Sequence, residues 1–527
     1  MRKLRSYIFL LLAVCSLAVC AQTDVSFSDV QRWTTAELRS YAGMTIRFTQ
    51  PVYTCNNYSS LTASLHRVMS PTNQCYPLTA EYNELLTVNG NSCFTLGGMS
   101  EYHRMGETIF GLVAQVNSSS SLTFVSCDSI RGTREDMERG YPSVDMSEEG
   151  GNVVKHNLLV CAANLEYYLV ENLGTGFGPD NASEQTKQHT KVMAALSRIR
   201  ADIYGFVEIE QGQSALAKIA NSLTAATGRN YSYVDDGGSS RGSYTKAGYV
   251  YCKDVVEPYG NMLQNNNVVS NRKQMQGFRM KAGGESFIFS LNHFKAKSGT
   301  GSGANADQGD GQGIFNADRV KEAQTILSEC PKAQSYYSED DILIMGDLNA
   351  YAKEDPITTL INGGMTDLHR FFHADSSYSY TFHGQAGYLD HALCNSSLLS
   401  QVTGMSVWHV NSDEHDRYTY DKSSDLTMFR YSDHDPVLVG LCLGSNISRA
   451  DAQQIQEVKM SWQEGKMHIE NAEQGWFLIA SPFGCVMCEG RITSENYVVQ
   501  EYLPNGLYII NVYANGGVNR VKYYKID

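Results

Sequence analysis

The feature that most constrains the fold is an apolar segment, residues 342–346, that ends at a glycine and is followed at once by Asp347 and Asn349. Such a run is typical of a buried strand, which delivers the polar residues after it to the end of a sheet. Residues 433–435 form an Asp-His-Asp cluster, and a second apolar run, residues 437–441, follows. Either motif alone is also typical of a turn with a side-chain cap. Together, oxygen ligands and imidazole at strand ends indicate metal-assisted attack of water on a phosphoester.

The chain is too long for one hydrophobic core. Its 527 residues predict about two to four domains. A hydrophobic content of 42% and a charged content of 19% are typical of a globular protein. The formal net charge of −14 argues against tight, nonspecific binding to DNA. It does not exclude a nuclease, because a local basic patch and metal ions can hold a transiently bound substrate.

The N-terminus predicts a targeting segment. Basic residues come first, residues 7–19 are apolar, and small residues follow up to Ala21. This order is typical of a signal peptide, here residues 1–21. The apolar run is far shorter than the roughly 20 residues of a membrane helix, so we expect no stable membrane insertion. Cys20 leaves a lipoprotein signal open, although Val19 is larger than the residue usual before a lipidated cysteine.

Three patterns follow one another along the chain. Residues 22–147 show short apolar alternations between turn signals, which predicts an all-β domain. Residues 153–443 alternate strand-like runs with helical spacing, which predicts an α/β domain. Residues 459–527 return to a β pattern and predict a small β-sandwich. The acidic, glycine-containing residues 145–151 are typical of a linker.

Polar residues suited to catalysis end several apolar runs of the α/β region. A single Glu or His in such a place is structural more often than not. Sheets, however, gather their sites beyond strand ends, so convergence of these side chains is geometrically reasonable. The residues concerned are Asn164, Glu208, His293, Asp347, Asn349, Asp390, Asp433 and His434.

Seven stretches, in order, resemble the endonuclease/exonuclease/phosphatase superfamily and, within it, the bacterial extracellular nucleases. They are residues 201–210, 292–297, 309–313, the pair Asn316 and Arg319, residues 346–356, residues 387–393 and the Asp433-His434 motif. The resemblance covers residues 153–443 and implies a four-layer α/β sandwich. One departure lies at residues 164–167, where relatives often carry a second Asn; it concerns substrate contacts of this loop and not the metal site.

The same resemblance implies a metal site. Glu208 is expected to be the principal metal ligand, with Asn164 and Asp433 assisting it. Oxygen ligands of this kind suit a hard divalent cation. Mg²⁺ is the expected ion, with Mn²⁺ or Ca²⁺ as alternatives.

The resemblance also implies catalytic roles. Asp347 and Asn349 are expected to hold the attacked phosphate and the water. His434 is expected to be the general base, oriented by Asp390, and His293 the acid or oxyanion stabiliser. Which histidine is the base and which the acid stays open at this point.

A glycine-rich stretch, residues 298–313, lies between a strand-like and a helical segment. It lacks the Gly-Lys-Ser/Thr ending of a P-loop, and its low apolar content predicts a mobile surface loop. Lys295, Lys297, Asn316 and Arg319 flank it and are the candidates for contacts to substrate phosphate. For each lysine, a solvated charged surface is the alternative.

The flanking regions allow looser inferences. The N-terminal β region resembles oligonucleotide/oligosaccharide-binding (OB) modules, which grip single strands with aromatic side chains, although a spacer fits equally well. Residues 503–512 and the last strand resemble the type IX secretion sorting domain of Bacteroidota, which implies the type IX machinery as a partner and passage through both membranes. An ordinary β-sandwich for binding carbohydrate or protein is the alternative.

These observations predict a secreted or cell-surface, metal-dependent nuclease that hydrolyses phosphodiester bonds of DNA, with RNA left open. One alternative is a phosphatase or phosphodiesterase of the same superfamily that acts on lipid or inositol phosphates. Another is a surface-binding protein with an inactive enzyme core, against which the intact set of acids, amides and histidines argues. The oligomeric state is not predicted.

Overall fold

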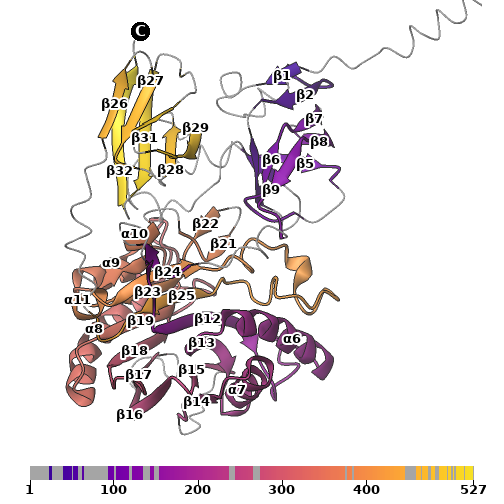
Figure 1. Cartoon of the computed structure of the whole chain (residues 1–527). Coiled ribbons are helices and arrows are strands. Elements are labelled where there is room, and N and C mark those ends of the chain that lie inside the picture. The colour runs from indigo at the N-terminus through magenta and orange to yellow at the C-terminus, as the bar shows by residue number, and fades with distance from the viewer. Residues whose placement is uncertain are drawn as a thin grey trace, which may run out of the picture. The chain divides into compact units, whose positions relative to one another are not determined.

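The computed structural model describes most of the central part of the chain and segments of both ends (Figure 1). The described residues are 23–25, 40–49, 51–56, 62–64, 93–99, 103–117, 121–134, 143–147, 153–236, 244–264, 273–373, 377–382, 385–445, 459–463, 466–472, 476–480, 486–494, 496–499, 503, 506–514 and 517–525. The predicted signal peptide, residues 1–21, lies outside them. The chain divides into two compact units, residues 1–68 with 83–138, and residues 69–82 with 139–527.

The first unit contains a nine-stranded sheet in the order β1-β2-β7-β8-β5-β4-β3-β6-β9. The strands are β1 (Thr23–Val25), β2 (Thr45–Phe48), β3 (Val52–Asn56), β4 (Thr62–Ser64), β5 (Cys93–Gly97), β6 (Thr108–Phe110), β7 (Val113–Val116), β8 (Ser121–Ser126) and β9 (Ser129–Arg131). Their buried apolar residues, among them Ile46, Phe48, Ile109 and Leu122, form one core. Buried positions alternate with less buried ones in β2 and β7, which is the pattern from which strands were predicted here.

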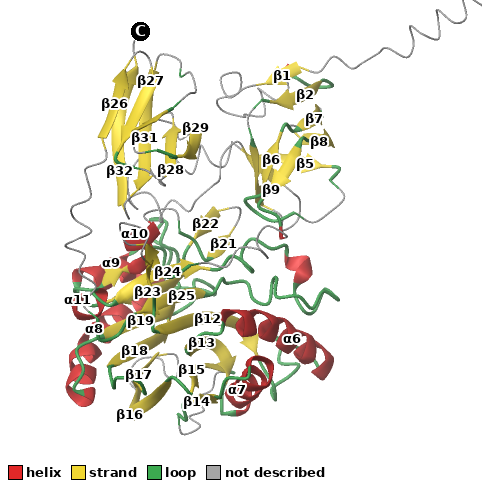
Figure 2. Ribbon diagram, in the orientation of Figure 1, coloured by secondary structure: helices red, strands yellow, loops and turns green. Residues whose placement is uncertain are grey.

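The second unit contains two six-stranded sheets between residues 153 and 445 (Figure 2). The first has the order β14-β15-β13-β12-β25-β24, with β12 (Leu158–Tyr168), β13 (Ile203–Glu210), β14 (Tyr231–Tyr233), β15 (Thr245–Cys252), β24 (Val402–Val407) and β25 (Val437–Leu441). The second has the order β16-β17-β18-β19-β23-β20, with β16 (Val256–Gln264), β17 (Lys273–Met280), β18 (Ser286–His293), β19 (Ile342–Asp347), β20 (Thr366–Asp367) and β23 (Asp390–Cys394). Within each sheet one central pair is parallel, β12 with β13 and β18 with β19.

Helices cover the outer faces of these two sheets. The main helices are α6 (Ala182–Ile199), α7 (Ser214–Thr227), α8 (Asn316–Tyr337) and α9 (Asp355–Asn362), with shorter α10 (Leu368–His373) and α11 (Ser396–Leu399). Helices α6 and α7 contact the first sheet, and α8 and α9 share an apolar core with the second. The strand–helix alternation predicted for this region is therefore present, and the layers run helix, sheet, sheet, helix (Figure 1).

Strand β19 shows why residues 342–346 are apolar without alternation. Leu343 and Met345 point into the core between the two sheets. Ile342 and Ile344 point the other way, into the core shared with α8 and α9. Every residue of the strand is buried. A strand covered on both sides reads as a continuous apolar run, which is how the sequence predicted it.

Helix α6 is held at its first turn by a side-chain cap and along its length by a contact with a distant loop. Helix α6 begins at Asn181, whose side chain accepts hydrogen bonds from the N–H groups of Ser183 and Glu184. From the same helix, the buried Lys191 donates through Nζ to the carbonyl of Asp425 at 3.0 Å. This contact ties the long segment before β25 to the helical layer. The predicted linker, residues 145–151, is in part a strand, because β10 (Met146–Ser147) pairs with β11 (Val153–Val154).

The C-terminal residues form two small antiparallel sheets. One contains β26 (Lys459–Gln463), β27 (Lys466–Glu470) and β30 (Asn496–Val498), and the other has the order β29-β28-β31-β32, with β28 (Trp476–Ala480), β29 (Val486–Arg491), β31 (Gly506–Ala514) and β32 (Gly517–Lys525). Buried residues of both sheets, including Ile469, Phe477 and Ile510, share one core. Among the described residues, no helix combines the length and apolar character needed to cross a membrane.

Candidate active site

Polar side chains from neighbouring strands meet at one end of the two sheets. In the second sheet, the pairing sets His293 of β18 opposite Asp347 of β19, and Asp347 opposite Asp390 of β23. In the first sheet, Asn164 of β12 pairs with Val207 of β13, one residue before Glu208. The pairing register therefore brings together residues that are far apart in the sequence, as the strand-end argument predicted.

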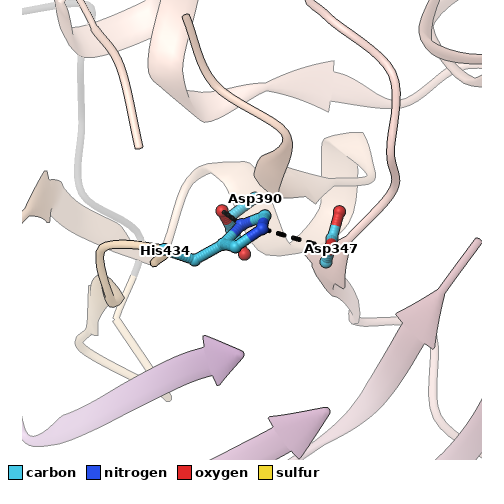
Figure 3. A group of neighbouring side chains, drawn as sticks. All are labelled: Asp347, Asp390 and His434. Carbon is cyan, nitrogen blue, oxygen red and sulfur yellow. Dashed lines mark hydrogen bonds and ion pairs between the residues drawn. The ribbon is translucent and has the colours of Figure 1, made fainter. Parts of the chain in front are cut away.

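The imidazole of His434 lies between two of these carboxylates (Figure 3). Its Nδ1 is 2.7 Å from Oδ2 of Asp390, and its Nε2 is 3.8 Å from Oδ2 of Asp347. Ser379 donates through Oγ to the same Asp390 oxygen at 2.7 Å. A buried carboxylate that accepts from Nδ1–H leaves Nε2 of the neutral imidazole free to accept a proton. The ring of Tyr380 stacks on His434 with centroids 4.6 Å apart, which restricts its rotation.

Asp347 lies between two histidines. Nε2 of His293 is 3.8 Å from Oδ2 of Asp347 and 3.6 Å from Oε1 of Glu208. The other oxygen of Asp347, Oδ1, accepts from the backbone N–H of Asn349 at 2.8 Å. The Asn349 side chain donates to the carbonyl of Phe294 at 3.3 Å, so its amide is turned toward the β18 end. The Nε2 atoms of both histidines thus lie near the same oxygen of Asp347.

Asn164 links the two sheets through hydrogen bonds. Its Nδ2 donates to Oδ2 of Asp347 at 3.2 Å, and its Oδ1 accepts from the backbone N–H of Glu166 at 2.9 Å. An amide oxygen has two lone pairs, so this bond leaves one of them for a cation. The role of Asn164 as an assisting metal ligand stays a prediction.

The backbone is strained where it presents these groups. Glu166, Tyr167, Glu208 and Asn349 have φ values of 46°, 53°, 56° and 48°, which non-glycine residues rarely adopt. The registers of β12 with β13 and of β13 with β15 also shift at this point. Such bulges re-aim side chains at the end of a sheet, and strain of this kind is concentrated at functional sites.

The carboxylates carry more negative charge than their surroundings balance. Burial, with repulsion from Asp433, raises the pKa of Glu208 to about 7. Burial is also the main reason that the pKa of Asp347 rises to about 7 and that of Glu166 to about 8. A charged acid in this site is thus disfavoured unless a cation joins it.

The pKa of His434 responds in the opposite direction. Burial by itself lowers it, but the carboxylates of Asp390, Asp433 and Asp347 outweigh burial and hold it well above the usual value. With the acids charged, the imidazole is protonated and can stabilise negative charge.

A divalent cation fits this set of residues. Asp347, Asp390 and His434 offer ligand atoms that lie within 4.8 Å of one another. Within this group, His434 and Asp390 are joined by a hydrogen bond, and Asp347 is the other carboxylate. Glu208, Asp433 and Glu166 are further oxygen donors close to these residues. Within the described part of the chain, Oε2 of Glu166 is buried and has no hydrogen-bond partner, which leaves one oxygen ready for a hard cation.

Two residues of the site were missed by the sequence reasoning. Burial raises the pKa of Glu166, and the nearby carboxylates of Asp433 and Glu208 raise it further. The charge of Arg430 opposes this rise. Arg430, which is half-buried, donates through Nη1 to the carbonyl of Asn411 at 3.1 Å. Glu166 stands two residues after Asn164, in the loop where the family pattern departs, and that departure was the available signal. No local pattern marks Arg430.

The four residues predicted to contact substrate phosphate lie around the glycine-rich stretch. Nζ of Lys297 donates to both carboxylate oxygens of Glu354, at 2.7 and 2.6 Å, and to the carbonyl of Gln312 at 2.6 Å. Arg319 is 0% exposed and donates to three carbonyl groups, including that of Gln312 at 2.9 Å. A guanidinium without accessible surface cannot reach a phosphate, so the prediction for Arg319 is not supported and that for Lys297 is weakened.

The remaining two candidates differ from each other. Asn316 donates through Nδ2 to the side chains of Gln312 and Asp355, at 3.1 and 3.0 Å. Nζ of Lys295 lies 4.1 Å from the centroid of the Phe315 ring, and the residue keeps part of its surface. Contrary to the expectation of a loop without fixed contacts, the stretch is anchored at Gln312 from three sides. Lys295 and Asn316 are both partly exposed, so their contacts with substrate phosphate stay predictions.

Comparisons with known proteins were made by sequence and by structure. No family model matches the chain, and no curated protein matches it. Among solved structures, an endonuclease/exonuclease/phosphatase from Bacteroides vulgatus is similar, with 18% identity, coverage of 54% of this chain and 98% of that chain, and a TM-score of 0.37. The mannosyl-6-phosphatase Bt3783 of Bacteroides thetaiotaomicron has 16% identity, 55% and 100% coverage and a TM-score of 0.36.

A third similar structure is D. rerio TDP2 in complex with a single-strand DNA product. It has 12% identity, covers 54% of this chain and 97% of that chain, and has a TM-score of 0.36. At these identities and TM-scores, none of the three assigns a function to this chain.

Proposed function

We propose that this protein is a divalent-metal-dependent phosphodiesterase that cleaves nucleic acid by activating water. The observation that carries the proposal is the His434–Asp390 pair, 2.7 Å apart, beside the uncompensated acids Asp347 and Glu208. A base with a fixed tautomer next to a site that requires a cation is what hydrolysis of a phosphoester needs.

His434 and Asp390 supply the base. Asp390 accepts from Nδ1–H, so Nε2 is the atom that takes the proton from the attacking water. As that proton arrives, the buried Asp390 carboxylate stabilises the imidazolium. Ser379 donates to the same carboxylate and keeps it oriented toward the ring.

His293 is suited to the opposite role. Its Nε2 lies 3.6 Å from Oε1 of Glu208 and 3.8 Å from Oδ2 of Asp347. A protonated imidazole can donate to the oxygen on which charge develops during displacement. We therefore assign His434 as base and His293 as the acid or oxyanion stabiliser.

Glu208, Asp433 and Glu166 would hold the metal. When bound, a divalent cation neutralises charge on the phosphate oxygens and offsets the repulsion among these acids. Arg430 lies near Glu166 and adds a fixed positive charge to the same edge of the site. Asn164 keeps Asp347 in place through its hydrogen bond of 3.2 Å.

The preference for nucleic acid over a phosphomonoester rests on the sequence. The stretch around Asn316 and residues 353–356 resemble those of the bacterial extracellular nucleases. In the structure, Asn316 donates through Nδ2 to the side chain of Asp355 at 3.0 Å. The two stretches are therefore hydrogen-bonded to each other, and the second follows the end of β19 in the chain.

We also propose that the chain is exported. The support is the signal-like segment at residues 1–21 and the C-terminal β-sandwich with its own core. Cell fractionation of the full chain, compared with a chain that lacks residues 459–527, tests this. Equal export of both would contradict a sorting role for the C-terminal residues.

The function is tested by incubating the full chain with plasmid DNA, a labelled single strand and a panel of phosphomonoesters, with Mg²⁺ and with excess EDTA. We expect diester cleavage that needs Mg²⁺ and is lost in His434→Ala. Release of inorganic phosphate from monoesters without diester cleavage would favour the phosphatase alternative. Full activity in EDTA would overturn metal dependence.

A further inference from the structure

A row of aromatic rings leads from the active site to the surface. The rings of Tyr167 and Phe177 are stacked, with centroids 4.9 Å apart and an interplanar angle of 21°. The centroid of Tyr244 lies 6.5 Å from that of Phe177. Phe177 is 51% exposed and Tyr244 is 45% exposed. The row begins at the site itself, because the backbone N–H of Tyr167 donates to Oε2 of Glu208 at 3.2 Å.

The loop that carries Phe177 is built to present it. Gly176 and Gly178, on either side, have φ values of 82° and 66°, which favour glycine. A Cβ on Gly178 would lie 2.4 Å from the carbonyl oxygen of Tyr167, so no larger residue fits there. The glycine lets the loop pack directly on the Tyr167 backbone, which brings the two rings into contact.

The base of the loop is clamped by the strand that carries Glu208. The carboxylate of Glu210 accepts from the N–H groups of Val170, Glu171 and Asn172 at 2.8, 3.0 and 2.7 Å. It also accepts from the Asn172 side chain at 2.7 Å. Because Glu210 is 1% exposed, these bonds are shielded from water. The loop is therefore preorganised relative to the catalytic strand, which lowers the entropy lost on binding.

A second, separate element repeats the arrangement. Tyr380, whose ring stacks on the base His434, is followed on β21 (Tyr380–Phe382) by Phe382. The two rings are 6.5 Å apart at an interplanar angle of 15°, and Phe382 is 55% exposed. Isolated exposed aromatics are ordinary on a protein surface. Two rows that each start at a catalytic side chain and end in an exposed ring are not isolated.

We propose that Phe177 and Tyr244, together with Phe382, form stacking platforms for the unpaired bases of a single-stranded nucleic acid whose phosphate lies in the active site. Exposed aromatic rings bind any base through its π face, and each stacked ring contributes to affinity without base sequence. Bases within a duplex have both faces covered, so the platforms favour single strands and frayed ends. This inference rests on the proposed phosphodiesterase function and defines its substrate class.

The test compares Phe177→Ala, Tyr244→Ala and Phe382→Ala with wild type in the full-length protein. Three substrates are used: a labelled single strand, the same sequence as a duplex, and an abasic strand of equal length, which has no ring to stack. We expect each variant to raise KM for the single strand by about 5- to 100-fold, to change the duplex less, and to leave the abasic strand unchanged. Phe371→Ala is the matched control, since Phe371 is 38% exposed and outside both rows.

Binding separates this inference from the proposed function. His434→Ala, which removes catalysis, is measured by fluorescence anisotropy with a single strand and with an abasic strand of equal length. Adding Phe177→Ala should weaken binding of the single strand but not of the abasic strand, and Phe177→Trp should restore it. This result can hold even if wild type cleaves no nucleic acid. Equal loss on both strands would overturn the base-stacking role.

Discussion

Two buried groups of charged side chains in the second unit differ in how their charges are balanced. The loop anchor consists of Lys297, Gln312, Arg319 and Glu354. The catalytic cluster consists of Glu166, Glu208, Asp347, Asp390 and His434. In the loop anchor, cations face Glu354 and backbone carbonyls. Burial raises the pKa of the acids in both groups, but in the loop anchor Lys297 and Arg319 oppose this rise for Glu354. In the catalytic cluster, the acids outnumber the cations. A buried charge that has its partner indicates a structural role, whereas an unbalanced group of acids indicates a site for a cation.

The largest expected effect is on catalysis. His434→Ala should lower turnover of a defined oligonucleotide by ~10²–10⁴-fold, because it removes the base. Asp390→Asn should cost a comparable factor, since it removes the acceptor that fixes the tautomer. The double variant should be little worse than His434→Ala, because the two side chains act as a unit. Fully multiplicative losses, with metal binding unchanged in each variant, would show that they work separately.

Substitutions in the loop anchor should lower the stability of the fold and leave turnover unchanged. Lys297→Met leaves the Glu354 carboxylate, which is 0% exposed, buried without its cation. We expect a loss of about 3–5 kcal/mol in the free energy of unfolding. The double change Lys297→Met with Glu354→Gln should recover much of it. Denaturant unfolding measures the loss, and turnover of the folded protein should stay near wild type. Lost turnover at unchanged stability would restore Lys297 as a substrate contact.

Metal binding should stabilise the catalytic cluster and leave the loop anchor unaffected. At 100 times the dissociation constant, a ligand that binds only the folded state adds about 2.7 kcal/mol. We expect Mg²⁺ to raise the melting temperature of wild type and of the Lys297→Met, Glu354→Gln double variant. Glu208→Gln should lose most of this increase. A shift of equal size in Glu208→Gln would mean that the ion binds elsewhere.

The smallest effect is a pH dependence of the metal-free protein. The pKa of Glu208 rises from 4.5 to about 7 on folding, so the folded state binds the proton more tightly between these values. Its charged form therefore weakens the fold above pH 7, and the penalty disappears as the pH falls toward 4.5. Glu208→Gln should stabilise the protein at pH 8 by on the order of 1–2 kcal/mol, given ~1.4 kcal/mol per unit and partial solvation. Thermal unfolding with EDTA should show this gain shrinking by pH 5. A gain independent of pH would rule out titration of Glu208 as its cause.

Residues whose surroundings are local could be predicted from the sequence. The apolar run that became β19 (Ile342–Asp347) and the polar residue at its end follow from strand periodicity and a glycine stop. The same reasoning identified Glu208 and His293 as strand-end groups, and the pairing of β18 with β19 sets His293 beside Asp347. The role of His434 came from the resemblance of its motif, and its assignment as base remains a prediction.

What the sequence by itself determined was the order of strands and helices and which polar residues stand at strand ends, since both depend on neighbours along the chain. Only the tertiary structure decided which charged side chains are available to bind a substrate or a metal ion. The predicted contact of Arg319 with phosphate is not supported and that of Lys297 is weakened, because Glu354 and the Gln312 carbonyl lie beside them in space. Glu166 joined the site because folding brought Asp433 to it. The availability of a charge depends on burial and on partners distant in sequence, and no local pattern records either of them.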